Sequence, residues 1–266
     1  MPPNDTTPGA VHLQCSGGIA TLVVDNAARM NSLTAAMWSA IPTLIAEAEA
    51  DPGVRVIVLR GMGERAFSAG ADISEFDTAR SGASAIEYDR LNDNAFNALS
   101  SCGKPTVAMI HGFCLGGGLG LALCTDLRLA DEKAQFAIPA AKLGIGYNAR
   151  WVRPLLAAVS PSRAKEMLYT GRRFSAQEAF AMGLLNAIVP TADLSARVQT
   201  LAEEIAANAP LTIHAAKLTI DELTRRPQSP DKAALDAAIN ACFDSADYAE
   251  GRRAFLEKRK PRFEGR

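Results

Sequence analysis

Histidine is scarce in this chain of 266 residues, which contains only His12, His111 and His214. A metal site built from histidines needs several such ligands close together, and no H-E-x-x-H spacing is present. The same scarcity argues against a histidine general base. The sequence therefore predicts no metal site and points to chemistry that other groups perform.

Paired cysteines are absent as well. The five cysteines are an odd number, are widely spaced and form no C-x-x-C. A secreted disulfide framework needs pairs and a zinc site needs clustered ligands, so neither is expected. Cys114 and Cys124 flank a glycine-rich turn and an apolar segment. Because free cysteine behaves as a small hydrophobic residue, we expect both to be buried thiols.

The chain also lacks a long apolar run and an excess of charge of either sign. No run of 18 apolar residues exists, and the first ten residues, MPPNDTTPGA, form no apolar leader. Lys and Arg number 28 against 29 Asp and Glu, a net charge of −1 that argues against a nucleic-acid or membrane-surface partner. With 48 % hydrophobic residues, the chain can bury a sizeable core. We expect a soluble, cytoplasmic protein with a flexible tail at 1–10.

Apolar patterns and turn signals predict an alternation of strands and helices over most of the chain. Residues 11–25 read as a hairpin around Gly17 and Gly18. Helical spacing predicts a helix within residues 34–51 with Thr34 as its N-cap, kinked or ended early by Pro42. Short apolar runs predict strands at 55–61, 105–112, 126–131, 135–139 and 186–190, with a helix around 84–101.

Helical patterns dominate from about residue 150. Ser175 to Glu178 form the capping box SAQE, and Gly183 stands where that helix should stop. Residues 193–260 predict successive helices broken at Pro210 and around 226–230. The sequence thus predicts an α/β core over 11–200 and a helical C-terminal region over 201–266.

The sequence does not match several motifs for cofactor binding or nucleophilic catalysis. The glycine run at 116–120 lies between a predicted strand and a helix, but Leu121 and Leu123 prevent a G-x-G-x-x-G match in any register. No P-loop sequence is present. Ser68 lies in A-F-S-A-G rather than in the G-x-S-x-G of a nucleophile elbow. Dinucleotide, phosphate-loop and serine-hydrolase functions are therefore disfavoured.

Two glycine-bearing turns remain, each directly after a predicted buried strand. They span residues 66–72 and 111–118. Small residues let a ligand approach the main chain, and the second turn opens a helix whose first N–H groups have no helical acceptor. Two such N–H groups aimed at one point would form an oxyanion hole. The alternative is that the glycines only permit tight turns and close packing.

These turns lie within a longer similarity. AFSAGADISEF, followed by KPTVAMIHGFCLGGGLGLALCTDLRLADEKAQFAIPAAKLGI and the ending EGRRAFLEKRKPRFEGR, resembles the crotonase (enoyl-CoA hydratase/isomerase) superfamily from about residue 11 to 264. The resemblance implies a spiral of repeated β-β-α units, acyl-CoA thioester substrates and an enolate held by two backbone N–H groups. It implies homo-trimers or hexamers, and no cofactor apart from the CoA of the substrate.

The resemblance also implies individual site residues. The oxyanion N–H groups fall on Ala71 and Gly117, and CoA contacts fall on Ser68, Ala69, Ala71, Asp72, Ile73, Gly116, Arg29 in RMNSL, and the C-terminal Phe255 and Lys258. The C-terminal pair often approaches CoA across a subunit contact in this family, although Lys258 would also fit a solvated charge. Asp126 matches a family position that we interpret as a structural carboxylate.

The chain departs from the family where a hydratase carries its two glutamates. The matching positions hold Gly120 and Ala140. An acid and a base each contribute roughly 10²–10⁴-fold to such a reaction, so efficient hydration is not expected. Tyr147 resembles in position a tyrosine of the methylmalonyl-CoA decarboxylase branch, although that branch carries a histidine where this chain has Ala71.

These departures favour decarboxylase-like or otherwise glutamate-independent chemistry. Tyr147 would bind the departing carboxylate or supply a proton, with Asn148 or Arg150 assisting; the alternative for Tyr147 is simple packing. Glu75 and Asp77 are the nearest other carboxylates in the sequence. Carboxylates in such a stretch more often form a solvated face than take part in a reaction. An atypical hydratase or isomerase and a non-catalytic acyl-CoA-binding scaffold stay open as alternatives, and the local basic run EKRKPR does not outweigh the neutral balance.

Overall fold

The structure is a computed structural model that describes residues 8–75 and 83–266. The first unit is the predicted hairpin, in which β1 (Ala10–Ser16) and β2 (Ile19–Asp25) pair in antiparallel fashion. Gly17 and Gly18 both have positive φ, the conformation that a tight turn between two strands requires. Helix α1 (Ala35–Ala50) follows, with the Thr34 side chain accepting from the Met37 N–H. It continues through Pro42, so the expected early end is wrong.

Three further turns of the chain repeat one pattern, which confirms the expected spiral. In each turn a strand enters a large sheet, a second short strand enters a small sheet, and helical structure follows. The turns are β3 (Val56–Gly61), β4 (Ala66–Ser68) and α3 (Ala83–Ser100); β5 (Thr106–Ile110), β6 (Phe113–Leu115) and α4 (Gly117–Leu123); β7 (Leu127–Asp131), β8 (Gln135–Ala137) and α5 (Ala149–Ala158).

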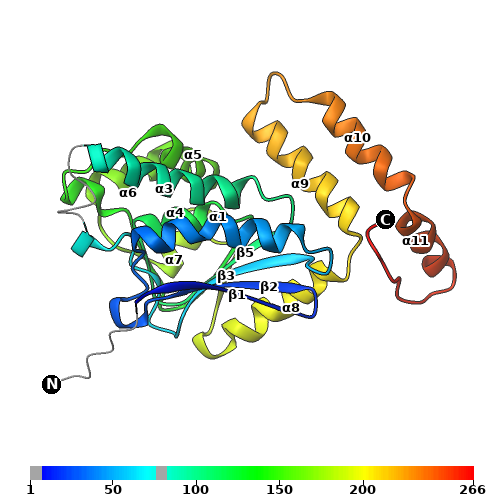
Figure 1. The fold of residues 1–266 in the computed structure, drawn as a ribbon, viewed down its shortest axis with the longest axis horizontal. Coiled ribbons are helices and arrows are strands. Elements are labelled where there is room, and N and C mark those ends of the chain that lie inside the picture. The colour runs from blue at the N-terminus through cyan, green and yellow to red at the C-terminus, as the bar shows by residue number, and fades with distance from the viewer. Residues whose placement is uncertain (1–7, 76–82) are drawn as a thin grey trace.

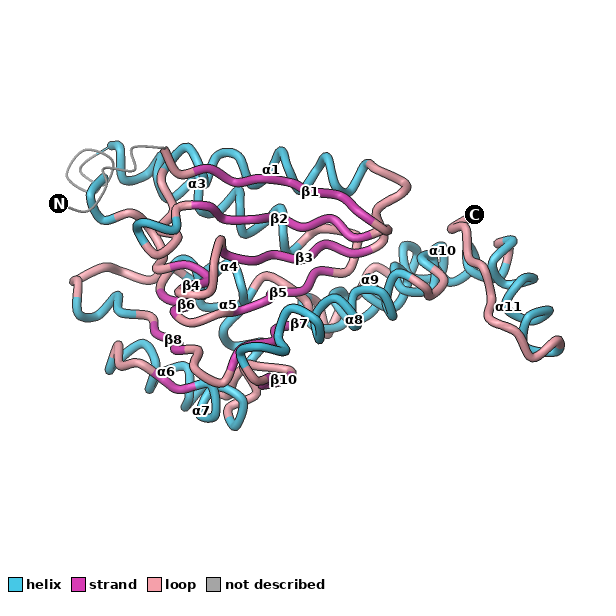
Figure 2. Tube along the Cα trace, turned by 90° about the horizontal axis from the view of Figure 1, so that it is seen from below, coloured by secondary structure: helices cyan, strands magenta, loops and turns pink. Residues whose placement is uncertain are grey.

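The strand order follows from this repetition. The large sheet runs β1-β2-β3-β5-β7-β10 and the small sheet runs β4-β6-β8-β9. Strands β4, β6 and β8 are parallel neighbours, so their carboxyl ends meet at one edge of the small sheet (Figure 2). The loops that leave these three strands are therefore brought together by topology.

The last elements of the core add one strand to each sheet, β9 to the small sheet and β10 to the large sheet. They are α6 (Pro161–Thr170), β9 (Phe174–Ser175), α7 (Ala176–Ala181) and β10 (Ala187–Val189). The capping box is confirmed, because the Ser175 and Glu178 side chains each accept from the other's backbone N–H. Gly183 lies two residues beyond the end of α7 with a φ of 89°, as a helix stop requires.

Helices cover both faces of the large sheet (Figure 1). α1 and α3 lie on one face, where Trp38, Phe96 and Leu99 join the larger hydrophobic core. On the other face, α8 (Leu194–Ala206) packs Leu194 and Val198 against residues of the large sheet in a second cluster. Residue 200 thus lies inside a helix that packs on the sheet, and the helices that leave the core begin after α8.

The remaining helices form an arm that projects from the core (Figure 1). They are α9 (Pro210–Arg225), α10 (Lys232–Phe243) and α11 (Ala246–Leu256). The predicted breaks are confirmed, since α9 begins at Pro210 and residues 226–231 separate α9 from α10. Proline is favoured at a first helical position because its missing N–H would have no helical acceptor there.

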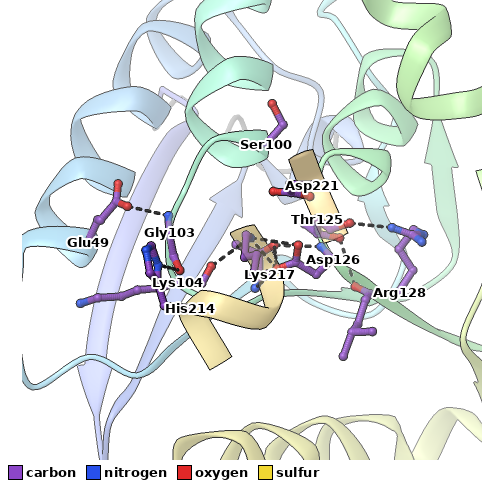
Figure 3. Close-up of polar contacts among 12 residues, drawn as sticks. Glu49, Ser100, Gly103, Lys104, Thr125, Asp126, Arg128, His214, Lys217 and Asp221 are labelled. Atoms are coloured by element: carbon purple, nitrogen blue, oxygen red, sulfur yellow. Dashed lines mark hydrogen bonds and ion pairs between the residues drawn. The ribbon is translucent and has the colours of Figure 1, made fainter. Parts of the chain in front are cut away.

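Polar contacts at the base of α9 attach this arm to the core (Figure 3). Lys217 Nζ lies 2.7 Å from Asp126 Oδ2 and also donates to the Lys104 carbonyl at 3.1 Å. The same Asp126 carboxylate accepts from the N–H and hydroxyl of Thr106, at 2.7 and 2.9 Å. His214 contacts the Gly103 carbonyl at 3.2 Å. Asp126 is therefore the structural carboxylate that the sequence predicted.

Candidate active site

The loops after β4, β6 and β8 line one cavity together with α3 and the segment around α5. Its volume is about 100 Å³. The described residues that line it are Ala69, Gly70, Ala71, Ile73, Asn92, Phe96, Gly116, Gly117, Ile138, Pro139, Ala140, Leu143, Ile145, Tyr147 and Trp151. The structure thus brings Ala71, Gly117 and Tyr147, the three predicted catalytic residues, to a single cavity. Ala69, Ile73 and Gly116 from the predicted CoA-binding set line it as well.

Glycine lets the first two loops approach closely. Gly70 has a φ of 93°, and a Cβ placed on it would lie 2.8 Å from the Leu115 carbonyl oxygen and 3.0 Å from the Gly117 nitrogen. A Cβ placed on Gly117 would lie 3.7 Å from the Ala71 nitrogen. Any side chain at Gly70 would therefore push the two loops apart, and the Ala71 and Gly117 nitrogens owe their proximity to glycine.

In the first loop, the N–H groups of three of the four residues 69–72 donate to acceptors within the protein. Ala69 donates to the Met30 carbonyl at 2.9 Å, and Asp72 donates to the Leu33 carbonyl at 2.9 Å. Gly70 donates to Ser68 Oγ at 3.1 Å. The Ala71 N–H donates to none of the described residues. Ala71 itself lines the cavity.

The second loop leaves a matching donor. Gly116 has a φ of 51° and donates to the Ala137 carbonyl at 2.8 Å, which ties this loop to the end of β8. Gly117 is the first residue of α4, where an N–H has no helical acceptor. No described residue accepts from it. Two backbone donors on facing loops are the arrangement that stabilises an oxyanion.

Ser68 lies beneath the first loop. It is fully buried, and its hydroxyl donates to the Asn31 carbonyl at 2.7 Å while accepting from the Gly70 N–H. A Cβ on Gly118 would meet the Ser68 carbonyl oxygen at 2.6 Å, so β4 and α4 also pack closely here. Ser68 is absent from the described cavity wall, and its visible role is to hold the loop that presents Ala71.

Arg29, Asp72 and Ser74 form a polar group beside the first loop. Arg29 Nη1 lies 3.0 Å from Asp72 Oδ2 and 2.9 Å from Ser74 Oγ. Burial alone would raise the pKa of Asp72, but hydrogen bonds from Ser74 and Arg29 favour the carboxylate and lower it overall. Arg29 stays largely exposed. Ile73, which lies in the sequence between the two partners of Arg29, is also exposed and lines the cavity.

The inner wall of the cavity is aromatic and apolar. Tyr147 and Trp151 pack edge to face with ring centroids 5.3 Å apart, and Phe96 packs in the same way on Trp151 at 6.4 Å. Phe96 also contacts Trp38 edge to face at 5.6 Å. Such edge-to-face contacts favour these ring orientations. Within the described lining, Tyr147 is the only ionisable side chain.

The two positions where the resemblance implies hydratase glutamates differ in their surroundings. Ala140 lines the cavity directly. Gly120 lies in α4, where an added Cβ would come within 2.7 Å of Phe96 Cζ. The Phe96 ring therefore occupies the space that a side chain at position 120 would need. The cavity wall thus carries a methyl group at position 140, and the Phe96 ring lies beside position 120.

The other polar residues that we considered have partners of their own. Asn148 caps α5 by accepting from the N–H groups of Arg150 and Trp151. Arg150 pairs with Asp93 at 2.5 Å and is largely exposed. Glu75 accepts from the Ala35 N–H at the start of α1, at 2.8 Å. Asp77 lies outside the described residues.

Phe255 and Lys258 lie apart from this cavity. Phe255 is on α11, at the far end of the arm, and is 84 % exposed (Figure 1). It lines a separate apolar cavity of about 810 Å³ between α9, α10 and α11. Lys258 follows α11 with a φ of 54°. Within one chain, therefore, the structure does not bring this pair to the Ala71 and Gly117 N–H groups, and their contact with CoA stays a prediction.

The sequence analysis missed the contribution of α3. Asn92 and Phe96 line the cavity, and Asp93 accepts from the Trp151 indole N–H at 2.8 Å. The four-residue spacing of Tyr88, Asn92 and Phe96 places them on one helical face, which was the available signal. The spacing alone did not reveal that this face meets the loops of the small sheet.

The described residues add three observations on chemistry and environment. They contain no group of three or more His, Cys, Asp or Glu side chains placed to hold a metal ion. No helix in the described part of the chain is long and apolar enough to cross a membrane. Cys114 and Cys124 are buried as predicted, and burial raises the pKa of the Cys124 thiol to about 12.

Comparison with known proteins places this geometry in a family. The enoyl-CoA hydratase/isomerase family model matches residues 14–266. The chain is 33 % identical over 245 residues to a crotonyl-CoA hydratase from Syntrophomonas wolfei, covering 92 % of this chain and 94 % of the relative. It is 38 % identical over 257 residues to a putative enoyl-CoA hydratase from Thermus thermophilus, covering 93 % and 98 %.

A solved structure shows the same fold. The crystal structure of an enoyl-CoA hydratase/carnithine racemase from Magnetospirillum magneticum matches with a TM-score of 0.93 and 36 % identity, over 96 % of both chains. The match includes the helical C-terminal region as well as the spiral core. With the family model spanning nearly the whole sequence, this chain belongs to the enoyl-CoA hydratase/isomerase family.

Proposed function

We propose that this enzyme converts an acyl-CoA thioester through an enolate held by the Ala71 and Gly117 N–H groups, without a glutamate acid–base pair. The observation that carries the proposal is that the Ala71 and Gly117 N–H groups, on two loops of one cavity, have no acceptor among the described residues. A thioester carbonyl oxygen becomes an oxyanion when the adjacent carbon gains an electron pair. Donors fixed in advance at that oxygen stabilise the charge without reorganisation.

The cavity lining favours decarboxylase-like chemistry over hydration. Hydration needs groups that activate and position water, and the described lining contains no Asp, Glu, His or Lys side chain. Decarboxylation needs less help: the bond between the α-carbon and the carboxylate breaks, CO₂ leaves, and the electron pair enters the thioester enolate. A proton then returns to the α-carbon. A wall without carboxylates also avoids repelling a carboxylated acyl group.

Tyr147 is the ionisable group placed to serve this reaction. It lines the cavity, and its ring is oriented by the edge-to-face contact with Trp151. A phenol can donate a hydrogen bond to the carboxylate before it leaves, or deliver the proton to the α-carbon afterwards. We assign Tyr147 these roles. Asn148 and Arg150 are engaged in helix capping and in an ion pair, so they are not needed for the proposal.

A second candidate function is an atypical hydratase. It is favoured by the names of the relatives, which describe a crotonyl-CoA hydratase and a putative enoyl-CoA hydratase. This reaction would have to work with Gly120 and Ala140 in place of acid–base groups. A third candidate, an acyl-CoA-binding scaffold without catalysis, would keep the cavity and use it only for binding.

The CoA portion would lie along the edge that Ile73 and Arg29 form. Arg29 supplies positive charge that attracts phosphate groups, while Ala69, Asp72 and Gly116 supply the main chain of the two loops. The proposed chemistry requires no cofactor beyond the CoA of the substrate. The free cysteines among the described residues support a cytoplasmic location, where thiols stay reduced.

We further propose that the chain assembles into homo-trimers or hexamers through its helical arm. Large apolar side chains on the arm are exposed in the single chain, among them Ile220, Phe243, Phe255 and Leu256. They accompany the apolar cavity between α9, α10 and α11. Exposed apolar surface of this extent is typical of protein contacts. Assembly would also offer Phe255 and Lys258 a route to the CoA of a neighbouring copy.

The first prediction concerns the reaction. Methylmalonyl-CoA and crotonyl-CoA, assayed side by side, should give measurable CO₂ release from the former and only slow hydration of the latter. The expected deficit in hydration is several powers of ten, because two groups worth roughly 10²–10⁴-fold each are missing. Fast hydration of crotonyl-CoA would contradict the proposal and support the atypical hydratase. Tight acyl-CoA binding without turnover of either thioester would support the scaffold.

The second prediction tests the oxyanion donor. Gly117→Pro removes the N–H at a helix position that tolerates proline, and turnover should fall by roughly 10²–10³-fold. Gly117→Ala is the matched control, since its Cβ meets the same Trp38 ring at 3.0 Å but the N–H remains. Steady-state kinetics on the active substrate measure both variants. Equal losses in the two variants would show that crowding, rather than the donor, causes the effect.

The third prediction concerns Tyr147. A Tyr147→Phe variant keeps the ring contact with Trp151 and removes only the hydroxyl. Loss of a proton donor should lower kcat by roughly 10²-fold or more. Kinetics with the substrate identified above provide the measurement, with near-ultraviolet circular dichroism as the folding control. Unchanged turnover would reduce Tyr147 to a packing residue.

The fourth prediction concerns assembly. Sedimentation velocity should find particles of three or six times the 28.1 kDa chain mass. A Phe243→Glu variant, which places charge on the exposed arm, should shift the distribution toward smaller particles. The matched control is Tyr169→Glu, an exposed aromatic residue on α6 rather than on the arm. A monomeric wild-type chain would overturn the proposed assembly.

A further inference from the structure

Asn31 is a buried amide outside the cavity, and its hydrogen bonds reach several segments of the chain. It is 1 % exposed and is not among the described residues that line the cavity. Burying an amide costs free energy unless its donors and acceptors are paired. The partners of Asn31 therefore show which parts of the molecule this residue holds together.

The side chain of Asn31 joins its own turn to the loop between β3 and β4. Its Nδ2 donates to the Met62 carbonyl oxygen at 3.0 Å and to the Ala66 carbonyl oxygen at 2.7 Å, at the two ends of that loop. Its Oδ1 accepts from the Asn26 N–H at 3.0 Å. The reverse orientation of the amide would place Oδ1 against two acceptors, so only one orientation satisfies the site. A Cβ on Gly61 would lie 2.6 Å from Nδ2, so this close approach also depends on glycine.

The backbone at Asn31 has an uncommon conformation. Met30 and Asn31 have φ values of 55° and 54°, in the left-handed region that residues other than glycine rarely adopt. Asparagine tolerates this region better than most residues. The Asn31 N–H donates to the Asn26 carbonyl oxygen at 2.9 Å, so Asn26 and Asn31 close the turn with two hydrogen bonds. The amide of Asn31 thus stabilises a backbone shape that the chain would otherwise avoid.

This turn supports the first glycine-bearing loop. The Ser68 hydroxyl donates to the Asn31 carbonyl oxygen at 2.7 Å and accepts from the Gly70 N–H at 3.1 Å. The Ala69 N–H donates to the Met30 carbonyl oxygen at 2.9 Å. The two residues with positive φ therefore present their carbonyl groups to the loop that carries Ala71.

Leu33, two residues after Asn31, determines the direction of the Ala71 N–H. It forms a parallel β-bridge with Ala71. Leu33 donates to the Gly70 carbonyl oxygen at 2.8 Å and accepts from the Asp72 N–H at 2.9 Å. In this register Leu33 makes both hydrogen bonds and Ala71 makes neither, so the Ala71 N–H is turned away from Leu33. The direction of this donor follows from the register of residues 30–33.

We propose that Asn31 is a positioning residue for the oxyanion donor of the first loop, because its amide holds residues 30–33 in the register that orients the Ala71 N–H. This inference rests on the proposed function, which assigns the thioester oxygen to the Ala71 and Gly117 N–H groups. Asn31 acts through the turn and through its bonds to the loop, without contact with the substrate.

The variant Asn31→Gly separates the amide from the backbone conformation. Glycine adopts a positive φ freely and keeps the carbonyl group that Ser68 binds, so only the side-chain hydrogen bonds are lost. A displaced donor still allows the thioester to bind but stabilises a developing charge less well. We expect kcat on the substrate that the enzyme turns over to fall about 10- to 100-fold, with a much smaller change in KM.

A second variant, Ser68→Ala, tests the same route with the Asn31 side chain intact. It removes the hydroxyl that links the Asn31 carbonyl to the Gly70 N–H. This variant should also lower kcat more than it changes KM. In the double variant the loss should be smaller than the product of the two single losses, because both residues act on one loop. Wild-type kcat in folded Ser68→Ala would contradict this route.

The matched control is Ser175→Ala, which breaks the capping box of α7. It removes a hydrogen-bonded hydroxyl from a part of the chain outside both glycine-bearing loops, and it should lower the melting temperature. The kcat and KM of the folded control should stay at the wild-type values. A fall in kcat equal to that of Asn31→Gly would show that lost stability, rather than loop position, causes the effect.

Infrared spectroscopy distinguishes this inference from the proposed function. The probe is butyryl-CoA, isotope-labelled at its thioester carbonyl and bound to the wild-type protein or to a variant. Two donors should lower the carbonyl stretching frequency below its value in water, and Asn31→Gly should move it back toward that value. An unshifted carbonyl in the wild-type protein would overturn the proposed function. A wild-type frequency and kcat in folded Asn31→Gly would overturn only the role of Asn31.

Discussion

The parallel pairing of β4, β6 and β8 is the constraint on which the site depends. These short strands carry few side chains, yet their order places three loops at one edge of the small sheet. The first two loops can then approach within van der Waals distance only because Gly70 has no side chain. The Ala71 and Gly117 donors thus result from main-chain topology and one missing Cβ. Side-chain identity contributes mainly through the shape of the cavity that surrounds them.

The packing of the cavity wall restricts which side chains the neighbouring positions can hold. Its inner wall is built from an aromatic group, in which Phe96 contacts both Trp38 and Trp151. Phe96 also fills the space beside Gly120, so the ring and a larger side chain at position 120 exclude each other. A larger side chain at position 120 would therefore require the Phe96 ring to move.

Much of the fold and of the site could be predicted from the sequence. The paired glycine turns and the resemblance that they carry predicted Ala71 and Gly117, and the structure brings both to one cavity with Tyr147. Local signals were also sufficient for the capping box at Ser175 and the break at Pro210. The early helix end expected at Pro42 was wrong, because α1 continues through this residue and packs Trp38 and Ile41 on the core. Tertiary packing outweighs local preference at that position.

The sequence did not allow a prediction of which residues from different helices, strands and loops lie in contact. Asn92 and Phe96 lie on a helix that the periodicity predicted, but no local rule states which loop this helix faces. Arg29 was expected at the CoA edge from the resemblance alone. Its contacts with Asp72 and Ser74, more than 40 residues away, follow from the return of the chain to the same edge. Such pairs depend on topology and cannot be read from spacing.

Helix α4 connects two parts of the molecule that the sequence keeps separate. Its first residue supplies the Gly117 donor, and Asp126, three residues after its last, is the carboxylate that anchors Lys217 of the arm. At 1.5 Å per residue this helix is only about 10 Å long. It therefore joins the Gly117 N–H, which is the proposed oxyanion donor, to the segment that anchors the arm. A displacement of the arm that moves Asp126 would reach this N–H through a single short helix.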